Sequence, residues 1–284
     1  MIRSKPRAVL KQRILTAVIL IPLLMAALFY LPLSWITLFF GAFIALAAWE
    51  WAALSGLQRI PAKMAYVICL LLFGLLSMNV IPNREDLVFS LFSATAIWWL
   101  WALVELMTRK EMNRGLFASV TGRLAGGILV LVPLWVASVY LLASDVNRPR
   151  LLLYLFVLVW AADTAAYIAG SLMGKTKLAP HISPGKTLEG VAGAVLGVVL
   201  LAWLCGTILW EYEDSRLALW IGLSVITALM SVVGDLTESK LKRIAGVKDS
   251  GKLLPGHGGV LDRIDALTAA VPLFALGTIF LFKI

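Results

Sequence analysis

Long apolar runs separated by short polar segments fill the chain from residue 14 to its end. Each run approaches about 20 residues, the length that an α-helix needs to cross a bilayer. Helices are expected because hydrocarbon offers no hydrogen-bond partner to an unpaired backbone group. The pattern predicts about nine transmembrane helices: Ile14–Leu31, Ser34–Leu54, Met64–Val80, Leu87–Met107, Leu124–Ala143, Leu151–Leu172, Leu188–Trp210, Leu217–Gly234 and Ala266–Phe282.

The composition supports a membrane protein. Of the 284 residues, 61% are hydrophobic and 14% are charged, whereas soluble domains are about half apolar and a quarter charged. We therefore expect an all-α, polytopic membrane bundle with a single integral membrane domain over residues 1–284. The apolar run after the basic segment Met1–Arg13 is longer than the core of a signal peptide, so we interpret it as an uncleaved first span.

The charge distribution predicts the orientation. With the N-terminus in the cytoplasm, 20 of the 25 Lys and Arg residues fall in cytoplasmic segments, which favours an N-in, C-out topology. This bias explains the net charge of +9 without a nucleic-acid partner. Cys69 and Cys205 lie in apolar runs and fit neither a disulfide framework nor a zinc site.

Polar residues are concentrated between the last two spans, in the stretch Gly234–Asp265, which contains five carboxylates and six cationic side chains. The preceding helix should continue past Gly234, which places Asp235, Glu238 or Ser239, and Lys242 on one face. The last span should begin near Asp262. Asp235 and Asp262 are therefore expected to face each other at the cytoplasmic boundary.

The chemistry of this stretch suits a metal and phosphates. Carboxylate oxygens are hard ligands, and Mg²⁺ usually takes one or two of them together with substrate phosphates and water. The neighbouring lysines and arginines suit a polyphosphate and a lipid phosphate. The alternative is a positive-inside loop whose acids only balance its bases.

Four carboxylates lie within or at the edge of the earlier spans: Glu50, Glu105, Asp163 and Glu189. Asp163 lies mid-span among small residues, which indicates a buried, functional carboxylate in the bundle interior. Glu50 and Glu105 lie about a turn from the cytoplasmic ends of their spans. For these two, a structural ion pair and a functional role both remain open.

The loop between residues 174 and 190 carries a candidate anion site. Ser183 or Thr187 can cap the following helix, and Pro184 suits an early helical position. Lys186 beside a helix N-terminus would favour a phosphate. An ordinary capped helix start with a topology-setting lysine is an equally good explanation of the loop alone.

Together these segments resemble the phosphatidate cytidylyltransferases (CDP-diacylglycerol synthases) of bacterial type. The resemblance covers the chain from about Trp160 to Asp265 and is densest in a 27-residue signature without a departure. The signature reads Ser239-x-Leu241-Lys242-Arg243, then Lys248-Asp249-x-Gly251, then Leu254-Pro255-x-His257-Gly258-Gly259-x-x-Asp262-Arg263-x-Asp265. Two further segments resemble the family: Trp160–Tyr167 and Ser183–Gly190.

The resemblance implies transfer of a cytidylyl group from CTP to phosphatidate, which gives CDP-diacylglycerol and pyrophosphate. It also implies Mg²⁺, with or without a second cation, a homodimer, and a multi-pass protein of the bacterial inner membrane whose active site faces the cytoplasm. The residues that would act directly in catalysis are Asp235, Asp262, Lys248 and His257. Those that would bind phosphates are Ser183, Lys186, Thr187, Ser239, Lys242, Arg243 and Arg263. Those that would hold the metal are Asp235 and Asp262, aided by Asp249 and Asp265. Asp163 and Glu189 are further polar residues in the membrane, and Lys186 and Asp163, from a separate loop and span, are expected to complete the site.

Two alternatives stay open at this point. An enzyme that acts with CTP on an isoprenoid lipid would use the same chemistry. Spans of Leu, Val and Ala do not show which lipid chain the protein binds. A secondary transporter could use Asp163, Glu50 and Glu105 as an ion path. Transporters usually show paired repeats with broken helices, and no such repeat is visible here.

Overall fold

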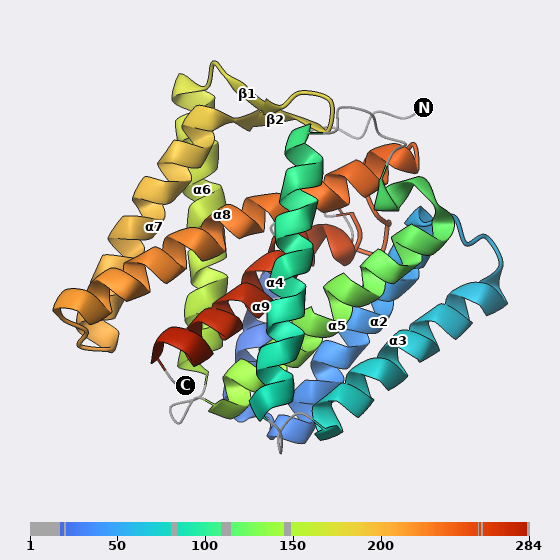
Figure 1. Ribbon diagram of the computed structural model, residues 1–284, viewed down its shortest axis with the longest axis horizontal. Coiled ribbons are helices and arrows are strands. Elements are labelled where there is room, and N and C mark those ends of the chain that lie inside the picture. Colours follow the sequence, from blue (N-terminus) through green and yellow to red (C-terminus); the bar gives the residue numbers. More distant parts are fainter. Residues whose placement is uncertain are drawn as a thin grey trace.

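The computed structural model describes residues 18–19, 21–80, 85–108, 115–144, 149–254, 256 and 258–282. Eight helices in these residues are long and apolar enough to cross a membrane, and Figure 1 shows them gathered in one bundle. They are α2 (Leu33–Leu54), α3 (Ile60–Val80), α4 (Glu85–Thr108), α5 (Val120–Ser144), α6 (Arg150–Met173), α7 (Leu188–Leu209), α8 (Asp214–Ile244) and α9 (Leu261–Phe282).

These helices confirm the predicted all-α polytopic membrane bundle. The first predicted span lies partly outside the described residues, which contain a shorter apolar helix, Ile21–Tyr30. The ninth span and the N-in, C-out orientation therefore stay predictions. Helix α8 has 31 residues and continues from its apolar run through Gly234 to Ile244, as expected.

Glycines allow several helices to approach closely. In α5, which stays helical through Pro133, a Cβ atom at Gly127 would overlap the side chains of Trp51 and Tyr66. Those two side chains reach the α5 backbone and donate hydrogen bonds to the carbonyl oxygens of Arg123, at 2.7 Å, and Leu124, at 3.0 Å. Close approach at small residues is the usual way in which membrane helices pack.

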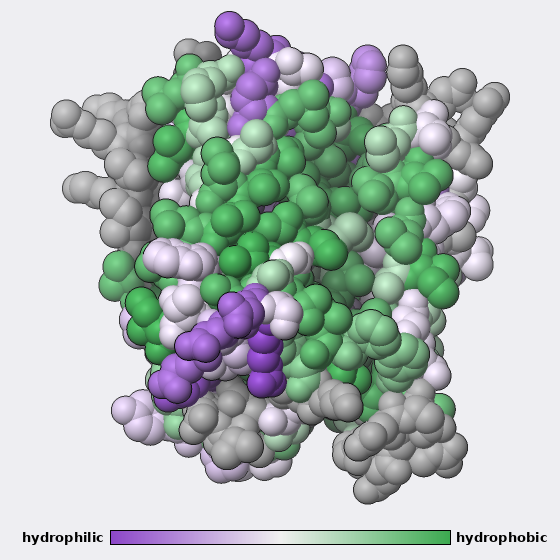
Figure 2. Space-filling view, turned by 60° about the vertical axis from the view of Figure 1, so that its left-hand side comes forward, coloured by the Kyte–Doolittle hydropathy of each residue, from purple (hydrophilic) through white to green (hydrophobic). Residues whose placement is uncertain are grey.

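Helices α6 and α7 form a tight antiparallel pair beside the rest of the bundle (Figure 1). A Cβ atom at Gly197 would lie 2.8 Å from the Cβ of Ala165, so the glycine permits this contact. The outward faces of the pair remain apolar, with Leu172 and Leu196 exposed. Figure 2 shows a broad hydrophobic band across this side of the molecule between more hydrophilic ends, as expected for a surface in contact with lipid.

A two-stranded antiparallel hairpin joins α6 to α7. Its strands are β1 (Lys177–Ala179) and β2 (Ser183–Thr187). The expectation that Pro184 occupies an early helical position is therefore wrong, because Pro184 lies in β2 and helix α7 begins at Leu188. The strands have three and five residues, and β2 (SPGKT) contains no large apolar side chain, so no hydrophobic period is present from which a strand could be recognised.

Glu105 has a structural ion pair in the bundle. Its Oε1 atom lies 2.7 Å from Nζ of Lys240, and both side chains are almost fully buried, at 3% and 2% exposure. The pair ties α4 to α8. This contact supports the structural reading of Glu105, since a buried carboxylate is tolerated in a span when a cation neutralises it.

Candidate active site

The polar end of α8 is joined to the hairpin by an ion pair. Nζ of Lys186 in β2 lies 2.6 Å from Oδ2 of Asp235, and both side chains are partly exposed. One turn further along α8, the hydroxyl of Ser239 donates a hydrogen bond of 3.2 Å to Oδ1 of Asp235. Asp235 and Ser239 were predicted to share one helix face, with Lys186 from a separate loop to complete the site, and the fold brings all three together.

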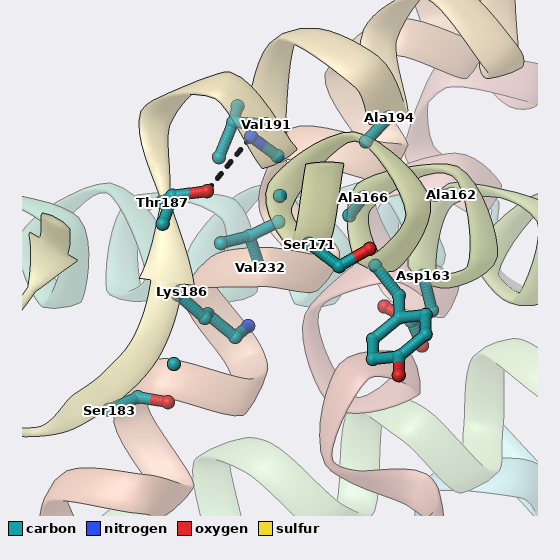
Figure 3. Close-up of a pocket in the computed structure, with 14 residues that line it drawn as sticks. Ala162, Asp163, Ala166, Ser171, Ser183, Lys186, Thr187, Val191, Ala194 and Val232 are labelled. Carbon is teal, nitrogen blue, oxygen red and sulfur yellow. Dashed lines mark hydrogen bonds between the residues drawn. The ribbon is translucent and has the colours of Figure 1, made fainter. Parts of the chain in front are cut away.

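A cavity of about 410 Å³ opens beside this ion pair, between α6, β2 and the start of α7. Figure 3 shows Asp163 and Lys186 on its walls, with Ser183 at one side. Much of the remaining wall is built from small residues, which leave the space free. Among these are Ala162, Ala166, Gly170, Gly185, Gly190 and Ala194.

Asp163 corrects a prediction about burial. It was expected to be buried in the bundle interior, but the structure leaves it exposed toward this cavity. Its carboxylate is near enough to interact electrostatically with Lys186 and Asp235. Small residues around Asp163 indicated close helix packing, yet here they form the wall of an open pocket.

Two predicted residues of the hairpin hold its local structure. Thr187 is the N-cap of α7, and its hydroxyl accepts a hydrogen bond of 3.1 Å from the backbone N–H of Gly190, drawn as a dashed line in Figure 3. This confirms Thr187 as one of the two predicted capping candidates. Both carboxylate oxygens of Glu189 accept from the backbone N–H of Thr176, at 3.1 and 3.2 Å. These contacts fix the hairpin that presents Lys186.

Asp262, in the first turn of α9, organises the loop that precedes it. Its Oδ1 atom lies 2.7 Å from Nζ of Lys242. Its Oδ2 atom accepts from the backbone N–H groups of Gly259, at 2.8 Å, and Ser250, at 2.9 Å. Asp262 thus pairs with Lys242, whereas Asp235 pairs with Lys186, so each carboxylate already has a lysine partner.

Glu50 reaches this loop from the distant helix α2. It is 7% exposed, and its carboxylate accepts from the Ser250 hydroxyl at 2.8 Å and from the N–H groups of Leu261 at 2.9 Å and Val260 at 3.1 Å. A Cβ atom at Gly259 would overlap this carboxylate. Glu50 therefore joins the loop to the N-terminus of α9, where unpaired N–H groups favour a negative charge.

Glu50 was left open by the sequence, and its role as an anchor was missed. The available signal was a carboxylate in a span without a cation one turn away. Partners 200 and more positions along the chain leave no trace in local sequence, so only the fold reveals them.

A group of carboxylates lies between α8 and α9. Glu238 and Asp265 interact electrostatically with each other, and Asp265 also interacts with Asp235. Glu238 is 2% exposed. Nζ of Lys242 lies 3.2 Å from its Oε1 atom.

The charge balance of this group favours a cation. Lys186 and Lys242 face Asp235, Glu238 and Asp265 as well as Asp262. Carboxylates in a low-dielectric site repel one another unless further positive charge is present. In the described residues, no three Asp, Glu, His or Cys side chains are grouped closely enough to hold a metal ion by themselves.

The other predicted residues lie around this centre. Lys248 and Asp249 are exposed on the loop between α8 and α9. The guanidinium of Arg243 donates to the carbonyl oxygens of Val247, at 3.0 Å, and Ile182, at 3.3 Å, and so links that loop to the hairpin. Arg263 is exposed and lines a second cavity. The predicted His257 lies outside the described residues.

The chain is similar to known proteins over most of its length. The chain matches the cytidylyltransferase family over residues 11–281. It is 40% identical to the phosphatidate cytidylyltransferase of Pseudomonas aeruginosa over 266 residues, which cover 94% of this chain and 96% of the relative. It is 39% identical to that of Haemophilus influenzae, with 94% and 97% covered. It is 38% identical to that of Synechocystis sp., with 75% and 76% covered.

Proposed function

Because this chain belongs to the cytidylyltransferase family, we propose that it transfers a cytidylyl group from CTP to phosphatidate and forms CDP-diacylglycerol and pyrophosphate. The structural observation that carries the proposal is the pairing of Lys186 with Asp235 beside a cavity of about 410 Å³. Cations and carboxylates around such a cavity suit a nucleoside triphosphate and its metal ion.

The reaction needs positioning and charge neutralisation more than covalent help from the protein. An oxygen of the phosphatidate phosphate attacks the α-phosphorus of CTP. The bond from that phosphorus to the bridging oxygen breaks, and the electron pair leaves with pyrophosphate. The attacking oxygen is already anionic, so no general base is required. Negative charge develops on the leaving group, where lysine and arginine side chains stabilise it.

The nucleotide would occupy the cavity between α6, β2 and α7. Ser183 and Lys186 line it and are placed to bind phosphate oxygens. Lys186 would release Asp235 in part when a triphosphate arrives, because the phosphate oxygens compete for the ammonium group. Lys242 on α8 and Arg263 in the first turn of α9 would add positive charge around Asp262, and Lys248 on the exposed loop would bind the leaving pyrophosphate.

Mg²⁺ fits the carboxylates between α8 and α9. Asp235 and Asp265 are the best placed to bind it, while Asp262, whose oxygens already contact Lys242, Ser250 and Gly259, would act at its edge together with Asp249. The carboxylates of Glu238 and Asp265, which interact with each other and with Lys242, support a cation in this region. When bound, the ion would neutralise phosphate charge and hold the triphosphate in line for attack.

The eight candidate spans make this a multi-pass membrane protein. The inner-membrane location, a cytoplasmic site and a homodimer belong to the proposal. The strong excess of Lys and Arg in the loops around the hairpin and α8 supports a cytoplasmic site, which is also the side on which CTP is available.

A detergent assay of the purified protein tests the function. We expect CTP-dependent turnover of phosphatidate with Mg²⁺, and at least about a hundredfold loss after metal removal by a chelator, reversed by added Mg²⁺. Polyprenyl phosphate serves as the competing substrate. Turnover of polyprenyl phosphate in preference to phosphatidate, or full activity without a divalent cation, would contradict the proposal.

A further inference from the structure

A second cavity lies among α2, α5, α6, α9 and the helix Ile21–Tyr30, and its character differs from that of the first. It has a volume of about 180 Å³, and its walls are almost entirely aromatic and aliphatic. The apolar side chains that line it are Leu24, Phe39, Phe40, Phe43, Ile44, Leu134, Trp135, Phe156, Trp160, Ile264 and Leu267.

The polar atoms inside this wall are mostly satisfied. The indole N–H of Trp135 donates to the carbonyl oxygen of Thr37 at 3.0 Å. The hydroxyl of Ser138 donates a hydrogen bond of 2.7 Å to the backbone carbonyl oxygen of Leu134. Of the described residues that line the cavity, only Arg263 is charged. Among the described residues, none accepts a hydrogen bond from its guanidinium, so its donors remain available for an anion.

Arg263 connects this cavity to the reaction centre, because it directly follows Asp262 in the first turn of α9. Helix α6 separates the two cavities: Phe156 and Trp160 line the apolar one, while Asp163 and Ala166 line the one assigned to CTP. The polar pocket thus lies beside the Lys186–Asp235 ion pair of α8, and the apolar pocket reaches the carboxylate end of α9. A nucleotide suits the first pocket and a lipid chain suits the second.

We propose that this apolar cavity holds one acyl chain of phosphatidate, with Arg263 at its mouth bound to the lipid phosphate. This inference rests on the proposed function and extends it to the lipid subsite. A chain that leaves the bilayer for this cavity gains little hydrophobic free energy, because lipid is equally apolar. The cavity instead contributes contacts with fixed aromatic walls and aligns the phosphate for attack.

The first experiment fills the cavity from two different helices. Leu134→Trp and Ile44→Phe each place extra volume in it. We expect kcat/KM for long-chain phosphatidate to fall about tenfold, while kcat/KM for a water-soluble short-chain phosphatidate and the KM for CTP stay at wild-type values. Equal losses with both lipids, in variants that remain monodisperse, would overturn the inference.

The matched control adds volume to a different apolar surface. Gly222 lines a groove between α8 and α9, and a Cβ atom placed there meets no heavy atom within 4 Å. Gly222→Leu should therefore leave the chain-length preference unchanged. The same shift of preference in this variant would mean that lipid access in general, rather than this cavity, determines it.

Photo-crosslinking tests the subsite without turnover. A phosphatidate analogue with a diazirine near the end of one acyl chain should label peptides from α2 and α5. Unlabelled phosphatidate should compete with it, and phosphatidylcholine should not. Labelling confined to the α8–α9 groove, or equal competition by both lipids, would exclude the subsite. Specific labelling by a protein that fails to turn over phosphatidate would instead overturn the proposed function and leave the subsite intact.

Discussion

The two ends of α8 and α9 are held together in opposite ways. At one end, Trp220 is fully buried and contacts the rings of Tyr154, Trp210 and Phe274, with centroids 4.7 to 5.7 Å apart. At the other end, ion pairs and hydrogen bonds reach in from α2 and β2. The aromatic end uses contacts that stabilise without regard to charge, whereas the polar end holds several carboxylates close together beside Lys186 and Lys242.

This difference separates stability from catalysis along the same two helices. Aromatic packing contributes dispersion and ring contacts that persist with any substrate. At the polar end, carboxylates held close to one another repel and lower stability, an arrangement typical of functional sites in membranes. Substitutions at the two ends should therefore affect different measurements.

The largest loss of turnover is expected for Asp235→Asn. The amide keeps the shape of the side chain but removes the charge that pairs with Lys186 and would bind Mg²⁺, so kcat should fall by about 100- to 1000-fold. Initial rates with CTP and phosphatidate measure it. Asp214→Asn, at the other end of α8, is the matched control and should keep wild-type turnover. Equal behaviour of the two variants would contradict the assignment.

Lys186→Gln should cost about a hundredfold in kcat/KM for CTP, because the side chain retains its reach but loses its charge at the nucleotide cavity. Lys177→Gln in the neighbouring strand β1 provides the control for the lost positive charge. The assignment of Lys186 to the nucleotide would be wrong if the variant changed only the KM for phosphatidate.

Glu50→Gln should lower kcat by about 10- to 100-fold, the range seen when a group that orients a site is removed. The amide would turn N–H donors toward the donors of Ser250 and Leu261. Hydrogen exchange should also rise in residues 246–259, and Glu211→Gln should change neither quantity. Lost turnover without faster exchange would mean that Glu50 acts in another way.

Trp220→Leu should have the smallest effect on turnover and a clear effect on stability. Removing an indole from the aromatic end should reduce the free energy of unfolding by about 3 kcal/mol, while kcat per folded molecule stays near the wild-type value. Thermal unfolding in detergent, followed by activity of the soluble fraction, measures both. A loss of kcat in correctly folded protein would remove the division between the two ends.

The bundle could be predicted because each span is visible in the sequence as an apolar run of about 20 residues. Helix α8 past Gly234 and the start of α9 near Asp262 were also predictable, since side chains on one helix face follow from a fixed period. The contacts of Glu50 and the pairing of Lys186 with Asp235 were not. These contacts join residues far apart in the chain, and the local sequence around each residue does not indicate its partner.

Asp163 shows that a local sequence pattern can also predict the wrong environment for a residue. A carboxylate among alanines reads as packed in the interior, because small residues serve both for close packing and for leaving space. Only the placement of α6 against β2 decides between the two. The hairpin was missed for a similar reason, since its few polar residues carry no hydrophobic period.

The most direct test of the account follows the phosphorus atoms of CTP. Purified protein would be incubated with Mg²⁺, phosphatidate and CTP labelled at either the α- or the γ-phosphate, and the lipid and aqueous phases would be counted separately. We predict that the α-label enters the lipid and the γ-label leaves as pyrophosphate, and that Asp235→Asn abolishes both transfers. A γ-label in the lipid would identify a phosphoryl transferase instead, and unchanged transfer by Asp235→Asn would place the reaction away from the polar end of α8.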